Sequence, residues 1–464
     1  MRRTAREHAP SILVAALSAA FGVALLQGTG ALALMIRADD TLGSSTAAGI
    51  ALASVAIVFI AIATYVAAIV TANTFATIIA GRVRTIALLR LLGATAVSQR
   101  RSVAREGFVV GCLGALIGAV AGTAITALAL GAAALAGWIP SLAYSFVDPV
   151  LLVPIVAVIL TTWIASWVGA RRVLVVSPLE ALGAAQERSV EQVGSRRARN
   201  ATALVMVILG FGLLGLGILA GLVSQAGVLI GMVGGMVSFT GVVLGAHAIM
   251  PWTLRSIGRV FGGSASARLA AANAVRYPER STRTTIGIVI GVTLVTMFGV
   301  AGGSFQSLFD RLLSGEDDAA QISLTIAAVV GIFSVLVGFS ALIAAVGLVN
   351  TLSLGIMQRT RELGLLRALG FTVRQLRAMV IAESGQLVAA AIVVGLLLGG
   401  FYGWAGAQSM LALVTGFPAF VVPVVSPVLL AVVVGGAVLL TIAASVVPTR
   451  RATSVSPVTA LAVE

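Results

Sequence analysis

Apolar runs long enough to cross a membrane recur along almost the whole chain, and they constrain the fold more than any other feature. Of the 464 residues, 59% are hydrophobic and only 10% are charged, whereas ordinary soluble domains are about 25% charged. An apolar run of ~18 or more residues predicts a membrane-spanning helix. We therefore expect an all-α integral membrane protein with about ten transmembrane helices, at residues 10–36, 48–79, 107–136, 149–170, 201–222, 227–250, 285–309, 322–356, 381–410 and 425–447.

The distribution of arginine predicts how these helices are oriented. All 30 Lys or Arg residues are arginine, and with the N-terminus inside, 28 of them fall in predicted inner segments. Only Arg37 and Arg311 fall in outer segments. The positive-inside rule then places both termini in the cytoplasm. It also explains the net charge of +14 better than a nucleic-acid-binding surface does.

Two charged segments between apolar runs are copies of one another. Residues 84–107 (RTIALLRLLGATAVSQRRSVAREG) align without a gap with residues 361–384 (RELGLLRALGFTVRQLRAMVIAES), 277 residues later. The identical pairs are Arg84/Arg361, Leu88/Leu365, Leu89/Leu366, Arg90/Arg367, Leu92/Leu369, Gly93/Gly370, Thr95/Thr372, Arg100/Arg377, Val103/Val380 and Glu106/Glu383. Such a match indicates a duplicated membrane unit.

The repeat extends beyond these segments. At the same shift, the pairs Asn73-Thr74 and Asn350-Thr351 match, and Gly118 and Gly122 match Gly395 and Gly399. Near the end of each unit the shift becomes 279, where RRVLVVSPLEAL (171–182) matches RRATSVSPVTAL (450–461). We therefore expect two parallel four-span units related by a pseudo-twofold axis along the membrane normal.

The expected organisation places two further spans between the units. The predicted parts are a first unit (1–182), a cytoplasmic linker (183–200), two inserted spans (201–250), a cytoplasmic amphipathic segment (251–284) and a second unit (285–464). The amphipathic segment alternates small apolar and basic residues and is expected to lie on the inner leaflet. A plain basic connector is the alternative.

The repeated segment has the pattern of a short helix, a turn and a second helix that runs into the next span. Leu363, Leu366 and Leu369 recur at three-residue spacing, which predicts an amphipathic helix. Gly370 is expected to end that helix, and Thr372 to begin the next one with a capping box. In the first copy, Gly93 and Thr95 take these places. A rigid projection of this kind suits docking to a partner; the alternative is an inert charged loop.

Small and polar residues within the spans are expected to pack helices together. The glycine stripes predict close-packing faces and are candidates for the central contact between the two halves; they comprise Gly114, Gly118 and Gly122 and, in the second unit, Gly395, Gly399 and Gly403. The two Asn-Thr pairs are interpreted first as interhelical hydrogen-bonding groups. Contact with a substrate along a transport pathway is the alternative for these pairs.

The sequence offers no pattern for chemistry on this chain. No predicted span carries Asp, Glu, Arg or Lys in its middle, which disfavours an ion-driven secondary transporter. The chain lacks a P-loop motif and contains no lysine. Two histidines and one cysteine do not make a metal-ligand cluster. Glu106 and Glu383 start matching spans beside arginines and are interpreted as interfacial ion-pair partners, so we expect no catalytic residue, metal or cofactor on this chain.

The stretch from Arg359 to Ser384, preceded by Asn350-Thr351, resembles the signature of the FtsX/MacB-like permeases of ABC transporters. The VSPxxAL motif after each unit is also typical of that family. The arrangement of ten spans resembles the BceB-like permeases, although the outer loops are too short for the large extracellular domain of those relatives. The first copy departs from the family pattern, since Thr85 and Ala87 stand where the second copy has Glu362 and Gly364.

The resemblance implies that the repeated segments are coupling helices for a separate cytoplasmic ATPase, with two ATPase copies per permease and ATP and Mg on that partner. The coupling residues would be Arg84, Leu88, Leu89, Arg90 and Gly93 in the first copy (84–93) and Arg361, Glu362, Leu365, Leu366, Arg367 and Gly370 in the second (361–370). It further implies a bacterial cell membrane and export of hydrophobic or amphiphilic compounds such as drugs, antimicrobial peptides or lipids. Without an extracellular domain, a substrate reached from the lipid is favoured. The alternative within the family is an ATPase-driven mechanotransmitter or regulator of a membrane or cell-wall partner.

Overall fold

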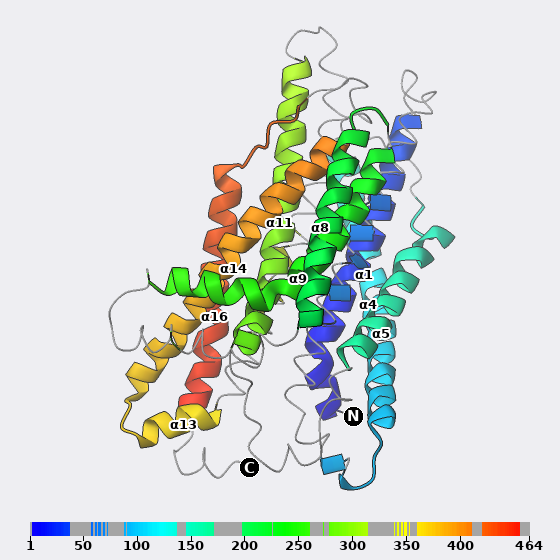
Figure 1. The fold of residues 1–464 in the computed structure, drawn as a ribbon. Coiled ribbons are helices and arrows are strands. Elements are labelled where there is room, and N and C mark those ends of the chain that lie inside the picture. Colours follow the sequence, from blue (N-terminus) through cyan, green and yellow to red (C-terminus); the bar gives the residue numbers. More distant parts are fainter. Residues whose placement is uncertain are drawn as a thin grey trace.

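The computed structural model describes most of the chain as long α-helices. It covers residues 2–37, 91–136, 145–170, 197–224, 226–259, 278–313, 360–410 and 420–454, with single positions between 57 and 89, at 272 and between 338 and 352. Within these residues there is no strand, which confirms the all-α class (Figure 1). The elements are α1 (Arg2–Arg37), α4 (Ala96–Leu135), η1 (Pro149–Leu151), α5 (Leu152–Gly169), α8 (Arg197–Ala220), α9 (Ala226–Gly258), α11 (Pro278–Leu313), α13 (Thr360–Ala368), α14 (Val373–Ser409) and α16 (Pro427–Ser454).

Seven of these helices are long and apolar enough to cross a membrane, and α16 contributes a shorter apolar stretch at Pro427–Ala443. Eight predicted spans therefore fall on described helices. The other two, at 48–79 and 322–356, are described only at scattered positions. The protein is a multi-pass membrane protein, and the count of ten spans stays a prediction.

Helices α4 and α14 are much longer than the spans predicted for them. They contain 40 and 37 residues, because the second helix of each repeated segment continues into the membrane helix without a break. This confirms the predicted junction. At 1.5 Å per residue, α14 is about 55 Å long, well beyond the ~30 Å of a hydrocarbon core.

The amphipathic segment expected at 251–284 is described only at its two ends, because residues 260–277, apart from position 272, lie outside the described residues. Helix α9 continues through Pro251 to Gly258, and α11 already begins at Pro278. The last part of α9 lies across the direction of its neighbours in Figure 1, consistent with the kink that an internal proline imposes. Leu254 of this part is buried against Leu387 of α14, while Trp252 is exposed. At the other end of the insert, α8 begins at Arg197 and so includes the end of the predicted linker.

Helices α1 and α4 pack in the first unit as α11 and α14 pack in the second. A Cβ atom on Gly118 of α4 would lie 2.2 Å from the carbonyl oxygen of Ala16 in α1. A Cβ atom on Gly399 of α14 would lie 2.5 Å from the carbonyl oxygen of Thr293 in α11. The helices thus touch backbone to backbone, as small residues permit in lipid.

The expectation that the glycine stripes join the two halves is wrong. Gly122 and Gly395 also face α1 and α11, respectively, so both stripes pack inside their own unit. A different contact links the first unit to the insert: the hydroxyl of Tyr65 donates to the carbonyl oxygen of Met236 in α9 at 2.8 Å. Glycine spacing indicates a close helix contact but does not identify the helix on the other side.

Candidate functional site

The repeated segments 84–107 and 361–384 are called the first and second coupling elements below, after the role expected for them. The second coupling element has the predicted helix–turn–helix geometry. Helix α13 ends at Ala368, and Gly370 has a φ of +99°, a conformation that glycine adopts cheaply. The amide of Phe371 donates to the carbonyl oxygen of Leu366 at 3.0 Å, which closes the helix as in a Schellman motif.

A capping box begins the helix that follows. The amide of Gln375 donates to Thr372 Oγ1 at 3.2 Å, and the amide of Thr372 donates to Gln375 Oε1 at 2.9 Å. Phe371 packs beside Leu376, in the positions of a hydrophobic staple that fixes the angle between the two helices. The predicted capping box is therefore confirmed, and the turn is stiff.

The first coupling element repeats this turn. Gly93 has a φ of +98°, and the amide of Ala94 donates to the carbonyl oxygen of Leu89 at 2.9 Å. The side chain of Thr95 accepts from the amide of Ser98 at 3.1 Å. The stop and the restart are thus confirmed in both copies. Because Ser98 stands where the second copy has Gln375, the first copy lacks the reciprocal half of the capping box.

Exposed leucines give both elements an apolar outer face. Leu369 is 71% exposed and Leu92, its equivalent, is 85% exposed. Leu365 and Leu88 are also exposed. Large apolar side chains on a projection outside the membrane helices indicate a surface for a protein partner.

The structure changes which leucines can make that surface. Leu366 is half-buried and packs on Leu376 and Met379, so it holds the turn together rather than facing a partner. The coupling residues expected from the sequence do not include Leu92 and Leu369, although their identity in the two copies is a signal that points to them.

Several candidate residues are placed only in part. Arg84, Arg90, Asn73, Thr74, Asn350 and Thr351, together with the side chains of Arg361 and Glu362, lie outside the described residues. Arg367 is half-buried, and Glu383 is buried while Glu106 is half-buried. The predicted roles of these residues in coupling or packing stay predictions.

A contact between an arginine and a tryptophan fastens the first element to its own unit. The guanidinium carbon of Arg100 lies 3.6 Å from the centroid of the Trp167 ring, and Arg100 Nε donates to the carbonyl oxygen of Trp167 at 3.3 Å. Such cation–π contacts contribute about 0.5–1 kcal/mol at exposed sites. In the second unit, Arg377 is exposed, and Val446 stands at the position that matches Trp167.

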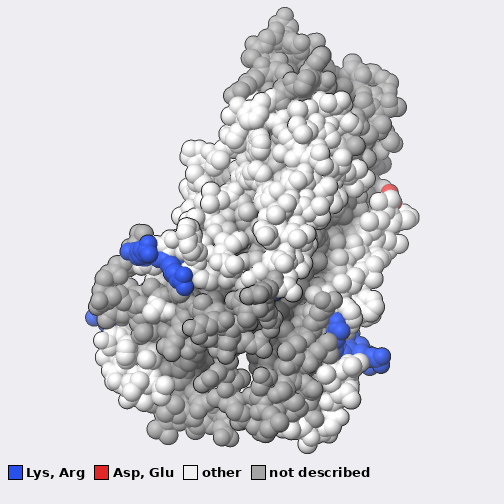
Figure 2. All heavy atoms as spheres, in the orientation of Figure 1, with Lys and Arg blue, Asp and Glu red and all other residues white. Residues whose placement is uncertain are grey.

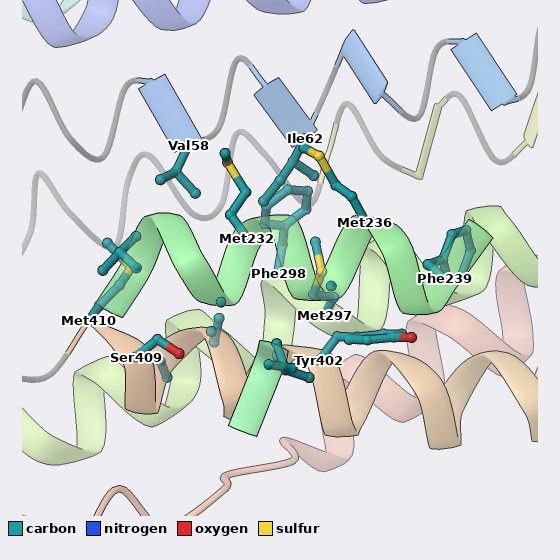
Figure 3. A pocket seen from close by; sticks show the side chains of 18 of the residues that line it. Val58, Ile62, Met232, Met236, Phe239, Met297, Phe298, Tyr402, Ser409 and Met410 are labelled. Atoms are coloured by element: carbon teal, nitrogen blue, oxygen red, sulfur yellow. The ribbon is translucent and has the colours of Figure 1, made fainter. Parts of the chain in front are cut away.

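An apolar cavity lies near the other end of α14 from the coupling turn. It has a volume of about 120 Å³ and is lined by α8, α9, α11 and α14 and by described positions of the predicted second span. Figure 3 shows Met232 and Met236 of α9 on the side of Val58 and Ile62, and Tyr402 of α14 on the other side of α9 in this view. The first unit, the insert and the second unit therefore all contribute to its wall.

The charged groups are kept away from this cavity. On the face shown in Figure 2, the described basic side chains lie at the level of the last part of α9 and below it, in the half of the view that includes α13. The described surface beyond them is almost free of charge. The basic end is the one that the positive-inside rule predicts to face the cytoplasm, and this orientation stays a prediction.

Comparison with known proteins assigns the repeated units to a family. The model of the FtsX-like permease C-terminal family matches residues 57–178 and 334–457. These regions start 277 residues apart and end 279 residues apart, the two shifts that relate the copies in the sequence. Helices α1, α8, α9 and α11 lie outside both regions.

One relative is an uncharacterized ABC transporter permease of Methanocaldococcus jannaschii. It is 35% identical over 85 residues, which cover 18% of this chain and 21% of the relative. The chain thus aligns with about a fifth of that protein. Because the family model covers more than half of the chain in two separate regions, the chain belongs to the FtsX-like permease family.

Proposed function

We propose that this protein is the transmembrane permease subunit of an ATP-driven exporter for hydrophobic or amphiphilic compounds. The observation that carries the proposal is the pair of coupling elements with the same turn. Gly93 and Gly370 share a left-handed conformation, and each turn leads directly into a helix of 40 or 37 residues. A stiff projection joined to a membrane helix is suited to receiving motion from a protein outside the bilayer.

The partner in this proposal is a cytoplasmic ABC ATPase, which holds ATP and Mg. Two ATPase copies would dock, one on each element, at the inner face of a bacterial cell membrane with both termini of this chain in the cytoplasm. The exposed Leu92 and Leu369 would enter apolar grooves on the ATPase, since buried apolar anchors supply much of the energy of such interfaces. This chain would transport and would not hydrolyse ATP.

Helix α14 supplies a path from the docking face to the membrane interior. It runs without interruption from Val373, beside the turn, to Ser409, at the cavity. Its glycine face lies against α11 with no side chain between the backbones at Gly399. A tilt imposed at the coupling turn would therefore displace Tyr402 and its neighbours, which suits a cycle of opening and closing around a hydrophobic substrate.

Exposed leucines allow the docking step to be tested without unfolding the turn. The chain is co-expressed with its candidate ATPase, and Leu92→Asp, Leu369→Asp and the double variant are compared with Leu369→Met. We expect the double variant to lose at least about tenfold in affinity, because a charge replaces a buried anchor on each side. Co-purification and ATPase stimulation are measured. An intact complex with full stimulation in the double variant would sink the proposal.

A further inference from the structure

The cavity beside Tyr402 has a lining that selects for uncharged ligands. Among its described lining residues, none carries a charge, and eight of the 21 are methionine or aromatic. Met232, Met236, Met297 and Met410 contribute four flexible thioethers, which adapt to differently shaped apolar groups. A charged ligand would lose its hydration here without gaining a partner, so the lining strongly disfavours its binding.

Most of the polar groups around the cavity are already paired with protein. The hydroxyl of Tyr402 lies 2.9 Å from Ser238 Oγ. The hydroxyl of Tyr65 donates to the carbonyl oxygen of Met236 at 2.8 Å and lies 2.7 Å from Thr240 Oγ1. These two tyrosines hold the wall in place, and a ligand that accepted a hydrogen bond from either hydroxyl would compete with those contacts.

One hydroxyl group differs from the others. Thr293 lines the cavity from α11 and is only 3% exposed. Its Oγ1 is fully buried and has no hydrogen-bond partner within the described part of the chain, so a ligand in the cavity reaches it only when the Thr293 side chain turns to another rotamer. Leaving a buried hydroxyl unsatisfied destabilises the folded protein, so a bound molecule with one hydrogen-bonding group would recover part of that loss.

The size of the cavity limits what can occupy it. Its volume of about 120 Å³ is close to the ~150 Å³ of an engineered apolar cavity that holds benzene. One aromatic ring with a small substituent fits this space, and a larger molecule would extend beyond it. A peptide fits poorly, since its backbone amides would meet almost no free partner in the lining.

We propose that this cavity binds an uncharged, ring-sized apolar molecule, or the apolar end of a larger one, through a single hydrogen bond to Thr293. Binding requires only this chain; export of the bound molecule rests on the proposed function. Because all three parts of the chain line the cavity, an occupant would also bridge the insert and the two units.

Three photoreactive probes that differ in one group test this inference. Each is a benzene ring carrying a trifluoromethyl-diazirine; the first adds a hydroxymethyl group, the second a carboxylate and the third only hydrogen. The full chain, without any ATPase, is labelled in phosphatidylcholine nanodiscs with and without excess benzyl alcohol. Adducts are mapped by mass spectrometry on the segments 232–239, 293–301 and 402–410. We expect saturable labelling by the alcohol, weaker labelling by the unsubstituted probe and at least about tenfold less by the carboxylate.

Two glycines of α14 provide a matched pair of variants. A Cβ atom added to either Gly406 or Gly400 would meet nothing within 4 Å, but only Gly406 lines the cavity. Gly406→Leu should therefore fill the cavity and abolish saturable labelling, whereas Gly400→Leu should leave it unchanged. Thr293→Val keeps the shape of the side chain but removes one hydrogen bond. It should lower the affinity of the hydroxymethyl probe about threefold to tenfold and leave the affinity of the unsubstituted probe unchanged.

The outcomes separate this inference from the proposed function. Labelling that is unsaturable, equal for the carboxylate, or unchanged in Gly406→Leu would overturn the cavity proposal and leave ATPase docking untouched. If labelling is saturable but the chain fails to bind its candidate ATPase in the separate co-purification test, the cavity proposal is supported and the proposed function is contradicted. If the hydroxymethyl probe binds Thr293→Val as tightly as it binds the original chain, the proposed hydrogen bond is wrong and the shape of the cavity alone selects the ligand.

Discussion

The hydroxyl of Tyr402 lies 2.9 Å from Oγ of Ser238, and this contact joins α14 to α9. Phe239, next to Ser238, packs edge-on against the Tyr402 ring with centroids 6.0 Å apart. The helix that carries the second coupling turn is thus fastened to the inserted pair near the cavity. Any displacement of α14 must either carry α9 along or break this contact.

Removing the Tyr402 hydroxyl should lower the stability of the folded protein by a measurable amount. Tyr402→Phe keeps the ring contacts and removes one interhelical hydrogen bond, which contributes about 0.6 kcal/mol on average in membrane proteins. Ser238→Ala should destabilise the protein by a similar amount. In a double-mutant cycle followed by thermal unfolding in detergent, the double variant should be little worse than either single variant. Fully additive losses would show that the two hydroxyls do not stabilise each other.

Adjacent glycines of α14 should differ sharply in their tolerance of alanine. A Cβ atom on Gly399 would lie 2.5 Å from the Thr293 carbonyl oxygen, whereas one on Gly400 meets nothing within 4 Å. Gly399→Ala should cost about 1–3 kcal/mol through overpacking. Gly400→Ala should be neutral or slightly stabilising, because alanine favours the helix.

Thermal unfolding of these two variants, measured side by side, tests the packing of α14 on α11. Equal melting temperatures would contradict the close backbone contact. The same comparison applies to Gly122, where a Cβ atom would lie 2.5 Å from the carbonyl oxygen of Ala20, against Gly131, which has open space.

Local sequence signals predict local structure well and contacts between distant residues poorly. The turn at Gly370 and the capping box at Thr372 follow from the preferences of the residues themselves, and both appear in the structure. The expected partner of the glycine stripes is wrong, because Gly118 contacts α1 of its own unit. Helix spacing places a small residue on a face but leaves open which helix covers it.

The cavity could not be predicted because no single stretch of sequence encodes it. Its wall combines Val58, Met232, Thr293 and Tyr402, which lie far apart in the chain. Leu366 shows the same limit on a smaller scale: the apolar spacing that predicts its helix does not reveal that it turns inward. Exposure along such a short helix depends on the turn that follows it.

Alanine at the coupling turn should open it locally. Gly370 has a φ of +99° with nothing within 4 Å of a Cβ position, so Gly370→Ala adds backbone strain alone, about 1–2 kcal/mol. Limited trypsin digestion should then cleave at Arg367 and Arg374 about 5–30 times faster, in proportion to the open population. Gly370→Asn should be milder, since asparagine visits this conformation more readily. Identical digestion rates in all three proteins would contradict a strained turn.

The two coupling elements should respond unequally to the same substitution. The second has a complete capping box at Thr372 and Gln375, whereas the first is held by Arg100 on Trp167. The first also departs from the family pattern at Thr85. We therefore expect Arg90→Ala to reduce ATPase stimulation less than Arg367→Ala does.

A steady-state ATPase assay of the complex with each single variant measures this difference. Trp167→Leu serves as a control for the anchoring contact, because it removes the cation–π interaction without touching the docking face. Losses of equal size at Arg90 and Arg367 would show that the two sites are equivalent. A larger loss at Arg90 would reverse the assignment of the stronger site.

The cavity wall combines residues from the family-matched regions with residues from outside them. Tyr402 and Val58 lie inside the regions that match the family, but the α9 and α11 walls lie outside them. Mutation can therefore remodel what the cavity admits while the turns at Gly93 and Gly370 keep their geometry. A duplicated chain built in this way can change the ligands that its cavity admits over evolutionary time while the two surfaces proposed to dock the ATPase stay the same.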